Sequence, residues 1–274
     1  MHKSKFFSLS FAATAISLIS APAMAVVVTT LQPAPTPGAW GVSDGTPEIV
    51  DLTGVGGNLE NNAPAGSGAL KLDTTGGVAK SEIKFGAPGP ITMGDFFNNP
   101  GGTLSYDYYQ VGGAPNSNIA PAFKFEVLDL TDTSGDGYAT FIFEPFYLTN
   151  SAPTKNAWTN QVLSLTQGFF WNTGIYGENG FVYDNTVTDW LALFGNTFLD
   201  AFILSMSFGI GSGTPDQIGY IDNVQINNGN FNQTYDFEVA AVPVPAALPL
   251  YASGLALMGF AGWRRRQKKA ALNA

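Results

Sequence analysis

The sequence predicts an all-β domain in which two sheets pack as a sandwich, and three observations lead to this prediction. Glycine (32 residues) and proline (17) are abundant while only 12% of residues are charged, which argues against long surface helices and against a disordered charged chain. Apolar and polar residues alternate over short segments that glycine, asparagine and proline separate. Helical periodicity is scarce. About nine strands at hairpin spacing indicate a two-sheet β-sandwich of the jelly-roll kind.

The alternating segments assign side chains to the two faces of each strand. In FKFEVLDL, Phe123 and Phe125 lie on one face and Lys124 on the other. In ATFIFE the apolar residues are continuous, which indicates a strand covered on both sides or one that faces a groove. The predicted strands are Val78–Phe85, Thr103–Val111, Ala122–Leu130, Tyr138–Leu148, Ala157–Leu165, Phe198–Ile210 and Ile218–Ile226, and the predicted helix is Val187–Phe194 with Thr188 as its N-cap.

The first 25 residues have the three parts of a secretory signal peptide. Two lysines precede an apolar run over residues 6–19, and Ala23 and Ala25 then form an A-x-A cleavage site for signal peptidase. An uncleaved anchor helix is the alternative, but the run is short and ends in small residues. Cleavage would make Val26 the first residue. The proline-rich stretch that follows predicts a linker over residues 26–38, so the sandwich is expected over 39–238.

The C-terminal segment, residues 239–274, has the composition of a membrane span with a basic tail. Residues 246–263 are apolar and just long enough to cross a bilayer as a helix with a rise of ~1.5 Å per residue. The sequence RRRQKK follows directly, and cations at this place stay on the cytoplasmic side. A buried core helix is the alternative, but it would not explain the cluster of cations. We therefore expect a transmembrane helix that leaves the preceding domain outside.

This segment resembles a PEP-CTERM sorting signal, which consists of a proline motif, an apolar helix and an arginine-rich end. It is similar to the Val-Pro-x-Pro-Ala variant, because Val244 stands where the founding motif has glutamate. The resemblance covers about the last thirty residues. It implies export, a transient membrane anchor, processing by an exosortase-type enzyme, and a surface or matrix location in a Gram-negative bacterium that makes exopolysaccharide. The matching residues are Val242, Pro243, Pro245, Ala246, Ser253, Gly254, Arg264, Arg265 and Arg266.

Composition excludes several kinds of chemistry. The chain has no cysteine, and its one histidine, His2, lies in the predicted signal peptide, so Ser-His-Asp and Cys-His mechanisms and His-ligated metal sites are excluded from the mature chain. Residues 26–238 contain five lysines, no arginine and all 21 acidic residues, a net charge of about −16. So acidic a surface repels phosphate backbones, which argues against nucleic-acid binding.

The segment GYIDNVQIN resembles the last strand of jelly-roll carbohydrate-binding modules and related galactose-binding-like sandwiches, over about ten residues. Strict alternation would place Asp222 on the same face as Tyr220, Val224 and Ile226. A buried carboxylate needs a partner because an unpaired buried charge costs several kcal/mol. In a domain without arginine, that partner is a lysine, a set of backbone N–H groups or a metal ion. Among metals, calcium suits the many oxygen ligands.

A second candidate cation site is the segment DLTDTSGDGYATFIFE. Asp132, Ser134 and Asp136 stand at the first, third and fifth places of an oxygen-ligand loop. Phe143 occupies the twelfth place, where an EF-hand loop has its bidentate glutamate. A plain hairpin turn accounts for the same residues, and we favour the turn over calcium.

Aromatic residues are concentrated between positions 146 and 190, where exposed rings could stack on sugars. We expect such a face to include some of Trp158, Trp171, Tyr176 and Trp190, although core packing of individual rings is the alternative. No motif selects a catalytic pair among the carboxylates, although Glu126 and Glu144 on neighbouring strands are an example of one. The sequence thus predicts a non-catalytic surface protein that associates with glycan. A purely structural matrix protein and a carboxylate-dependent glycan-active enzyme are the alternatives.

Overall fold

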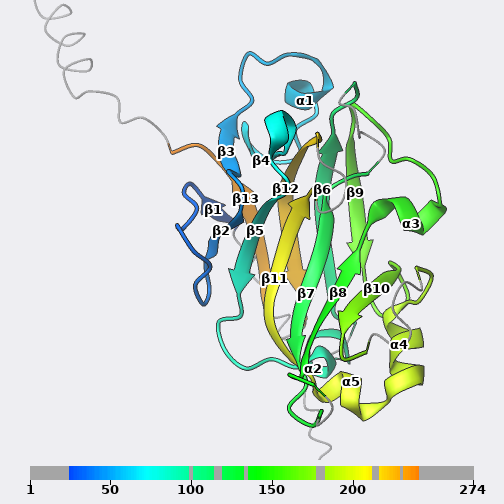
Figure 1. Cartoon of the computed structure of the whole chain (residues 1–274). Helices are drawn as coiled ribbons and strands as arrows, with labels where there is room; N and C mark the ends of the chain where they lie inside the picture. The colour runs from blue at the N-terminus through cyan, green and yellow to red at the C-terminus, as the bar shows by residue number, and fades with distance from the viewer. Residues whose placement is uncertain are drawn as a thin grey trace, which may run out of the picture. The chain divides into compact units, whose positions relative to one another are not determined.

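A computed structural model describes residues 25–98, 101–113, 119–132, 135–176, 183–211, 216–228 and 231–240. The described residues up to Glu238 form one compact unit. The structure of this unit is mainly β, with a seven-stranded and a six-stranded sheet, which we name sheet A and sheet B (Figure 1). The predicted two-sheet β-sandwich is therefore confirmed.

Sheet A is arranged around the long strand β12. One edge of β12 pairs with β13 along one half and with β4 along the other, while its opposite edge pairs with β6. β1 extends the sheet beyond β13 as a parallel strand, β3 extends it beyond β4, and β9 pairs with β6. These strands are β1 (Val26–Val28), β3 (Glu48–Asp51), β4 (Gly68–Asp73), β6 (Thr103–Gln110), β9 (Trp158–Leu163), β12 (Ile218–Asn227) and β13 (Asn232–Phe237).

Sheet B is antiparallel throughout and has the strand order β10-β8-β7-β11-β5-β2. Its strands are β2 (Trp40–Asp44), β5 (Ser81–Gly86), β7 (Ala122–Leu128), β8 (Tyr138–Phe143), β10 (Phe170–Gly174) and β11 (Phe202–Ile210). The short helices are α1 (Gly57–Asn61), η1 (Thr75–Gly77), α2 (Met93–Asn98), α3 (Pro145–Thr149), α4 (Val187–Phe194) and α5 (Asn196–Asp200).

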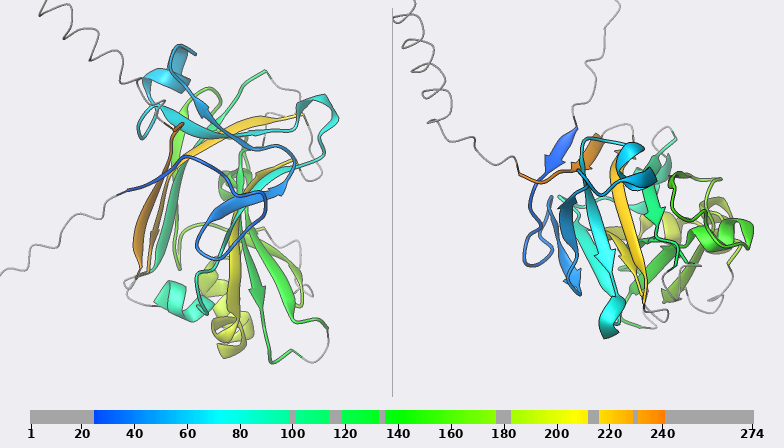
Figure 2. Two further views of the ribbon diagram at one scale, coloured as in Figure 1. Left: turned by 90° about the vertical axis from the view of Figure 1, so that its left-hand side faces the viewer. Right: turned by 90° about the horizontal axis from the view of Figure 1, so that it is seen from above.

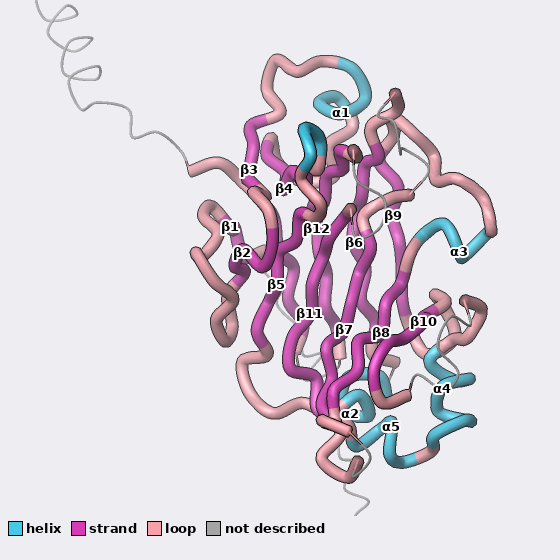
Figure 3. Tube along the Cα trace, in the orientation of Figure 1, coloured by secondary structure: helices cyan, strands magenta, loops and turns pink. Residues whose placement is uncertain are grey.

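The core lies between the two sheets, which the turned views show as separate layers (Figure 2). Alternate residues of each strand point inward, so Phe123, Phe125 and Phe208 of sheet B are fully buried, as are Ile221 and Val224 of sheet A. Helices lie at the periphery of the strands (Figure 3), and α2, α4 and α5 gather at one end of the sandwich (Figure 1). Burial of so many aromatic and aliphatic side chains is the main stabilising contribution.

Two predicted strands were too long, each because a short helix replaces one end. Pro145 is the first residue of α3, so the strand predicted to reach Leu148 ends at Phe143. Proline lacks the N–H that a sheet requires and suits the first turn of a helix. Similarly, Phe198 belongs to α5, and β11 begins only at Phe202. Phe198 reaches the core from a helix, so its apolar character was misread as strand alternation.

The predicted helix is present as α4, but its N-cap differs from the predicted Thr188. Thr186 is the cap: its hydroxyl accepts a hydrogen bond from the backbone N–H of Asp189, whose carboxylate accepts one from the backbone N–H of Thr186. This reciprocal capping box satisfies donors that would otherwise be unpaired at the helix start.

Most of the predictions for the two termini concern residues outside the described part of the chain. The predicted signal peptide lies outside the described residues except for Ala25, and so do the predicted transmembrane helix and the basic tail. In the part of the chain that the structure describes, no helix is both long and apolar enough to span a bilayer. Within the predicted linker, Val26–Val28 pairs with β13, and Gln32 bridges to Gly41. The sandwich thus begins before residue 39.

Candidate functional site

The outer face of sheet B carries the polar side chains that alternate with the core residues. Lys124 and Glu126 on β7 point outward because Phe123 and Phe125 point into the core. The strand register arranges the outward residues in rows across the sheet. One row contains Glu82, Gly209 and Ala122; the next contains Lys84, Ser207, Lys124, Ile142 and Trp171; a third contains Gly86, Ser205, Glu126, Thr140 and Thr173.

A groove of about 330 Å³ lies on this face. Small residues of the central strands, Gly209 on β11 and Ala122 on β7, form part of its lining, between β5 on one side and β8 and β10 on the other. Its volume is at the low end of the range for small-molecule sites, about 300–1,000 Å³. Its lining includes Lys80, Glu82, Lys124, Glu126, Thr140, Ile142, Glu144, Trp171 and Thr173.

Ion pairs connect the charged side chains of this face. Glu82, only 3% exposed, accepts from Lys124 and also pairs with Lys80 at 3.1 Å. Lys84 pairs with Glu126, which accepts a second hydrogen bond of 2.7 Å from the hydroxyl of Ser205. Buried carboxylates are stable only with such partners. We call these five charged residues the groove network.

Gly209 makes the bridge from Glu82 to Lys124 possible. These two residues lie on β5 and β7, with β11 between them. A Cβ added at Gly209 would lie 3.0 Å from the Oε2 atom of Glu82 and 3.2 Å from its Cβ atom. The space that a side chain would fill is therefore occupied by Glu82, which extends over the glycine to reach Lys124.

The two most buried glutamates of the groove differ in electrostatic environment. Burial alone would raise the pKa of Glu82, but Lys124 and Lys80 outweigh it and hold this pKa below its usual range. Burial raises the pKa of Glu144, and the nearby Lys124 and the Trp171 side chain offset this only in part. Glu82 is thus firmly ionised, whereas Glu144 is a weaker acid at the rim between β8 and α3.

The four aromatic residues expected to bind glycan do not share one face. Trp171 is half-buried and lines the groove. Tyr176 and Trp190 are 3% and 0% exposed, so the expectation that they are surface rings is wrong. Trp190 packs against Phe141 and donates its Nε1–H to the carbonyl of Phe170 at 2.9 Å. α4 and α5 bring these rings against the core, a contact that local sequence does not specify.

Trp158 is half-buried on the opposite sheet. Its Nε1–H donates to the carbonyl of Leu59 in α1 at 3.0 Å, and its ring meets that of Tyr109 edge to face with centroids 5.6 Å apart. These residues belong to a second apolar cluster on the outer face of sheet A, which also includes Leu52, Ala69 and Tyr220. Trp158 therefore packs against the segment that covers sheet A.

Asp222 is fully buried, as predicted, but on a different face from the one that alternation gives. The register between β12 and β6 shifts between Asp222 and Gln225, and Asn223 has φ 49°. This β-bulge reverses the alternation, so Ile221 and Val224 both join the core and Asp222 does not. The Asp222 carboxylate accepts the backbone N–H of Phe237 at 3.1 Å, while its Oδ2 atom has no hydrogen-bond partner. Burial raises the pKa of Asp222 to about 7.

The loop before β8 has the contacts of a turn. Asp132 accepts the backbone N–H of Gly135 at 3.0 Å, and Asp136 accepts that of Tyr138 at 3.0 Å. The backbone N–H of Asp129 bonds to the carbonyl of Gly137 at 2.8 Å and closes the β7–β8 hairpin. Among the described residues, no group of three or more acidic residues is placed to hold a metal ion.

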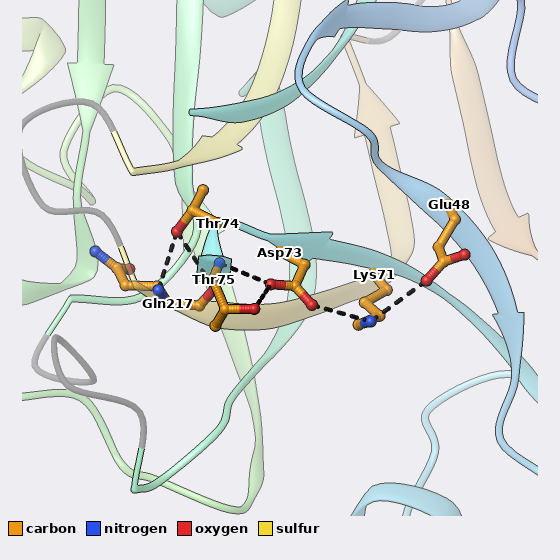
Figure 4. A network of polar contacts seen from close by, with 6 residues as sticks. All are labelled: Glu48, Lys71, Asp73, Thr74, Thr75 and Gln217. Carbon is orange, nitrogen blue, oxygen red and sulfur yellow. Dashed lines mark hydrogen bonds and ion pairs between the residues drawn. The ribbon is translucent and has the colours of Figure 1, made fainter. Parts of the chain in front are cut away.

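A separate polar network lies at the edge of sheet A (Figure 4). Lys71 on β4 pairs with Glu48 on β3 at 3.3 Å and with Asp73 at 3.0 Å. Asp73 accepts from the backbone N–H of Thr75, and Thr74 bonds to Gln217. These contacts connect the ends of β3, β4 and β12. They involve none of the residues that line the groove.

A second cavity, of about 340 Å³, has a mainly apolar lining that includes Phe85, Met206 and Phe231. No charged side chain lines it, and Ser205 and Asn228 are its polar residues. It therefore offers few of the polar groups that orient a ligand, and the groove on sheet B is the better candidate site.

Sequence reasoning placed Lys124 correctly and missed the network around it. Glu82 and Lys84 alternate with Ile83 and Phe85 in SEIKFG as Lys124 and Glu126 do in FKFEVL. Two strands with the same alternation of charged and apolar residues, in a chain with few charges, could have indicated that their charged side chains share one face of a sheet. What the sequence could not specify is that β5 and β7 flank β11 in one sheet.

Comparisons with known proteins add little. No model of a known protein family matches the chain, and no curated protein matches it. Among solved structures, an exo-beta-agarase is similar over 70% of this chain and 23% of its own, with 15% sequence identity and a TM-score of 0.37. At that level of similarity the function has to be argued from this chain's own residues.

Proposed function

We propose that this chain is an exported, non-catalytic protein that associates with glycan through the groove on the outer face of sheet B. The observation that carries the proposal is the half-buried indole of Trp171 beside hydrogen-bonding side chains in that groove. An indole face stacks on the C–H faces of a sugar ring, and carboxylate, ammonium and hydroxyl groups bond to its hydroxyls. We also propose that the two-sheet fold is a jelly roll of the carbohydrate-binding kind.

The destination follows from the two ends of the chain. We propose that signal peptidase removes residues 1–25 and that an exosortase-type enzyme processes the C-terminal segment after a transient stay in the inner membrane. The mature protein would then lie at the cell surface or in the matrix of an exopolysaccharide-producing Gram-negative bacterium. Glycan would be abundant there, and weak single sites could act through many copies.

The non-catalytic assignment is supported by the pairing of the carboxylates. Glu126 pairs with Lys84 and accepts a hydrogen bond from the hydroxyl of Ser205. Glu82 is engaged by two lysines, which leaves it poorly suited to proton transfer.

Glycan titration of the full chain tests the proposal, with Trp171→Ala and Trp158→Ala as a matched pair of half-buried tryptophans on opposite sheets. Loss of a stacking ring costs on the order of 1 kcal/mol, so Trp171→Ala should weaken binding about fivefold. Trp158→Ala should leave the affinity unchanged. Melting curves check that both variants are folded. Equal affinity of the two variants would overturn the assignment of binding to the groove. No binding of any glycan by the wild type would leave the structural matrix role.

A further inference from the structure

The charges of the domain are divided unequally between the groove and the rest of the surface. Three of the five lysines between residues 26 and 238 belong to the groove network: Lys80, Lys84 and Lys124. Four of the 21 acidic residues lie on the same face: Glu82, Glu126 and Glu144 line the groove, and Asp44 lies beside Lys80. This face therefore carries charges of both signs in nearly equal number, while the remaining 17 carboxylates are accompanied by only two lysines.

The three lysines of the groove network are already paired. Lys124 and Lys80 share Glu82, Lys80 also lies 3.9 Å from Asp44, and Lys84 pairs with Glu126. A sugar carboxylate or sulfate could gain a cation only by displacing one of these glutamates. The displaced Glu82 would then remain buried without its partners, which is a large penalty.

The electrostatic field of the whole domain also opposes the binding of acidic polysaccharides. A polyanionic chain that extends beyond the groove would approach a surface whose charges are almost all negative. Repulsion of this kind is felt over about 8–10 Å at physiological salt and slows association. An uncharged chain meets neither obstacle.

The groove nevertheless has the groups that an uncharged sugar uses. Carboxylate oxygens accept hydrogen bonds from sugar hydroxyls, the lysine ammonium groups and Thr140 and Thr173 donate to them, and Trp171 offers an apolar face. We infer that the ligand of this groove is a neutral polysaccharide and that Glu82 excludes acidic ones by holding Lys80 and Lys124. This inference rests on the proposed function and names its substrate class.

Competition between two probes tests it on the full chain: laminarin oligosaccharides, which are neutral glucans, and alginate oligosaccharides, which are polyuronates. We expect the neutral probe to bind at least about tenfold more tightly and to bind equally well at low and high salt. Binding must fall in Trp171→Ala to be assigned to the groove.

Two variants sharpen the test. Glu82→Gln removes the carboxylate that Lys80 and Lys124 share and frees both cations, so alginate binding should rise about tenfold and should weaken with salt. Glu144→Gln changes the charge equally but breaks none of the ion pairs in the groove network, and it should raise alginate binding less. It also keeps the test decisive if Glu82→Gln does not fold.

The outcomes separate the two proposals. Alginate binding by the wild type that matches laminarin binding and is lost in Trp171→Ala would overturn the neutral class and leave the glycan-binding function intact. The same conclusion follows if neither glutamate variant gains alginate affinity. Binding of neither probe, nor of any other neutral or acidic glycan, would overturn the proposed function itself.

Discussion

The outer faces of the two sheets have similar aromatic and polar residues, but one face is covered by another segment of the chain and the other is open. On sheet A, the connection between β3 and β4 folds back over the strands, and Leu52 and Leu59 pack on Tyr109 and Trp158. On sheet B, nothing comparable covers the central strands among the described residues, and a groove with paired charges lies open. The comparison shows that a tryptophan on the outer face of a strand is a candidate binding residue only where no other segment of the chain packs over its side chain.

The same contrast applies to acidic residues. Asp222 lies on β12 in sheet A without a cation in contact, and its Oδ2 atom is unpaired, whereas Glu82 in sheet B has two lysines. Their pKa values consequently move in opposite directions, raised for Asp222 and lowered for Glu82. Four predictions test how far the two faces differ, beginning with the largest effect.

The largest expected effect is a loss of stability between pH 4 and pH 7 caused by Asp222. Burial raises its pKa in the folded state from 3.8 to about 7, so in this window the folded chain holds a proton that the unfolded chain has lost. The unfolding free energy therefore falls as pH rises, by roughly 4 kcal/mol from this group, and levels off above pH 7. Thermal melting across this range measures the effect.

Asp222→Asn is the control for this prediction, because an amide oxygen can still accept the N–H of Phe237. The variant should lose the downward trend and be more stable than the wild type at pH 8. A chelator should not change the melting temperature, because among the described residues no group of three or more acidic side chains is placed to hold a metal ion with Asp222. A melting temperature that drops with chelator in the wild type but not in Asp222→Asn would instead favour the calcium site expected from the sequence.

The second prediction concerns the cover of sheet A. Leu59 is 7% exposed in α1 and packs within the second cluster, so Leu59→Ala should destabilise the domain by about 3 kcal/mol through lost burial and the cavity left behind. Chemical denaturation measures this. Glycan affinity should stay unchanged, because the cover lies on the sheet opposite the groove. A stability unaffected by the substitution would mean that the cover contributes nothing to the fold.

The sequence predicted the sandwich well because alternation between core and solvent is a local property. Phe123, Lys124 and Phe125 have the faces that the pattern assigns. Continuous apolar residues in ATFIFE were interpreted as two-sided cover or a groove, and Ile142 lines the groove. Strand β13, with the sequence NQTYDF, was missed because only two of its residues are strongly apolar.

The site was predicted far less well, for reasons that are not local. The β-bulge at Asn223 reverses the alternation after Asp222, and nothing in IDNV marks it except an asparagine that tolerates a positive φ. Trp190 lies on the buried face of the predicted helix α4, and Tyr176 packs against Phe194 of α4 and Phe198 of α5, contacts that the aromatic density of the segment does not reveal. The groove network depends on the order of β5, β11 and β7, which is fixed by the whole fold.

The third prediction tests the buried ion pairs of sheet B. Glu82→Gln should destabilise the protein by about 2 kcal/mol at pH 7, because Lys124 loses a partner in a partly buried position. The folded-state pKa of Glu82 is lowered, so its contribution exists above the unfolded-state pKa and is lost as pH falls. The difference between wild type and variant should therefore shrink below pH 4. A difference that persists in strong acid would assign the loss to packing rather than charge.

The smallest expected effect is at the corresponding ion pair of sheet A, between Lys71 and Glu48 (Figure 4). Glu48 is 58% exposed, so solvent screens the pair, and Lys71 keeps Asp73 at 3.0 Å when Glu48 is neutralised. Glu48→Gln should thus cost less than about 1 kcal/mol, and high salt should reduce even that difference. Melting of Glu48→Gln beside Glu82→Gln makes the comparison direct. Equal losses of stability in the two variants would show that burial does not distinguish the two networks. The charges of the groove would then be no more firmly held in place than those at the surface of sheet A.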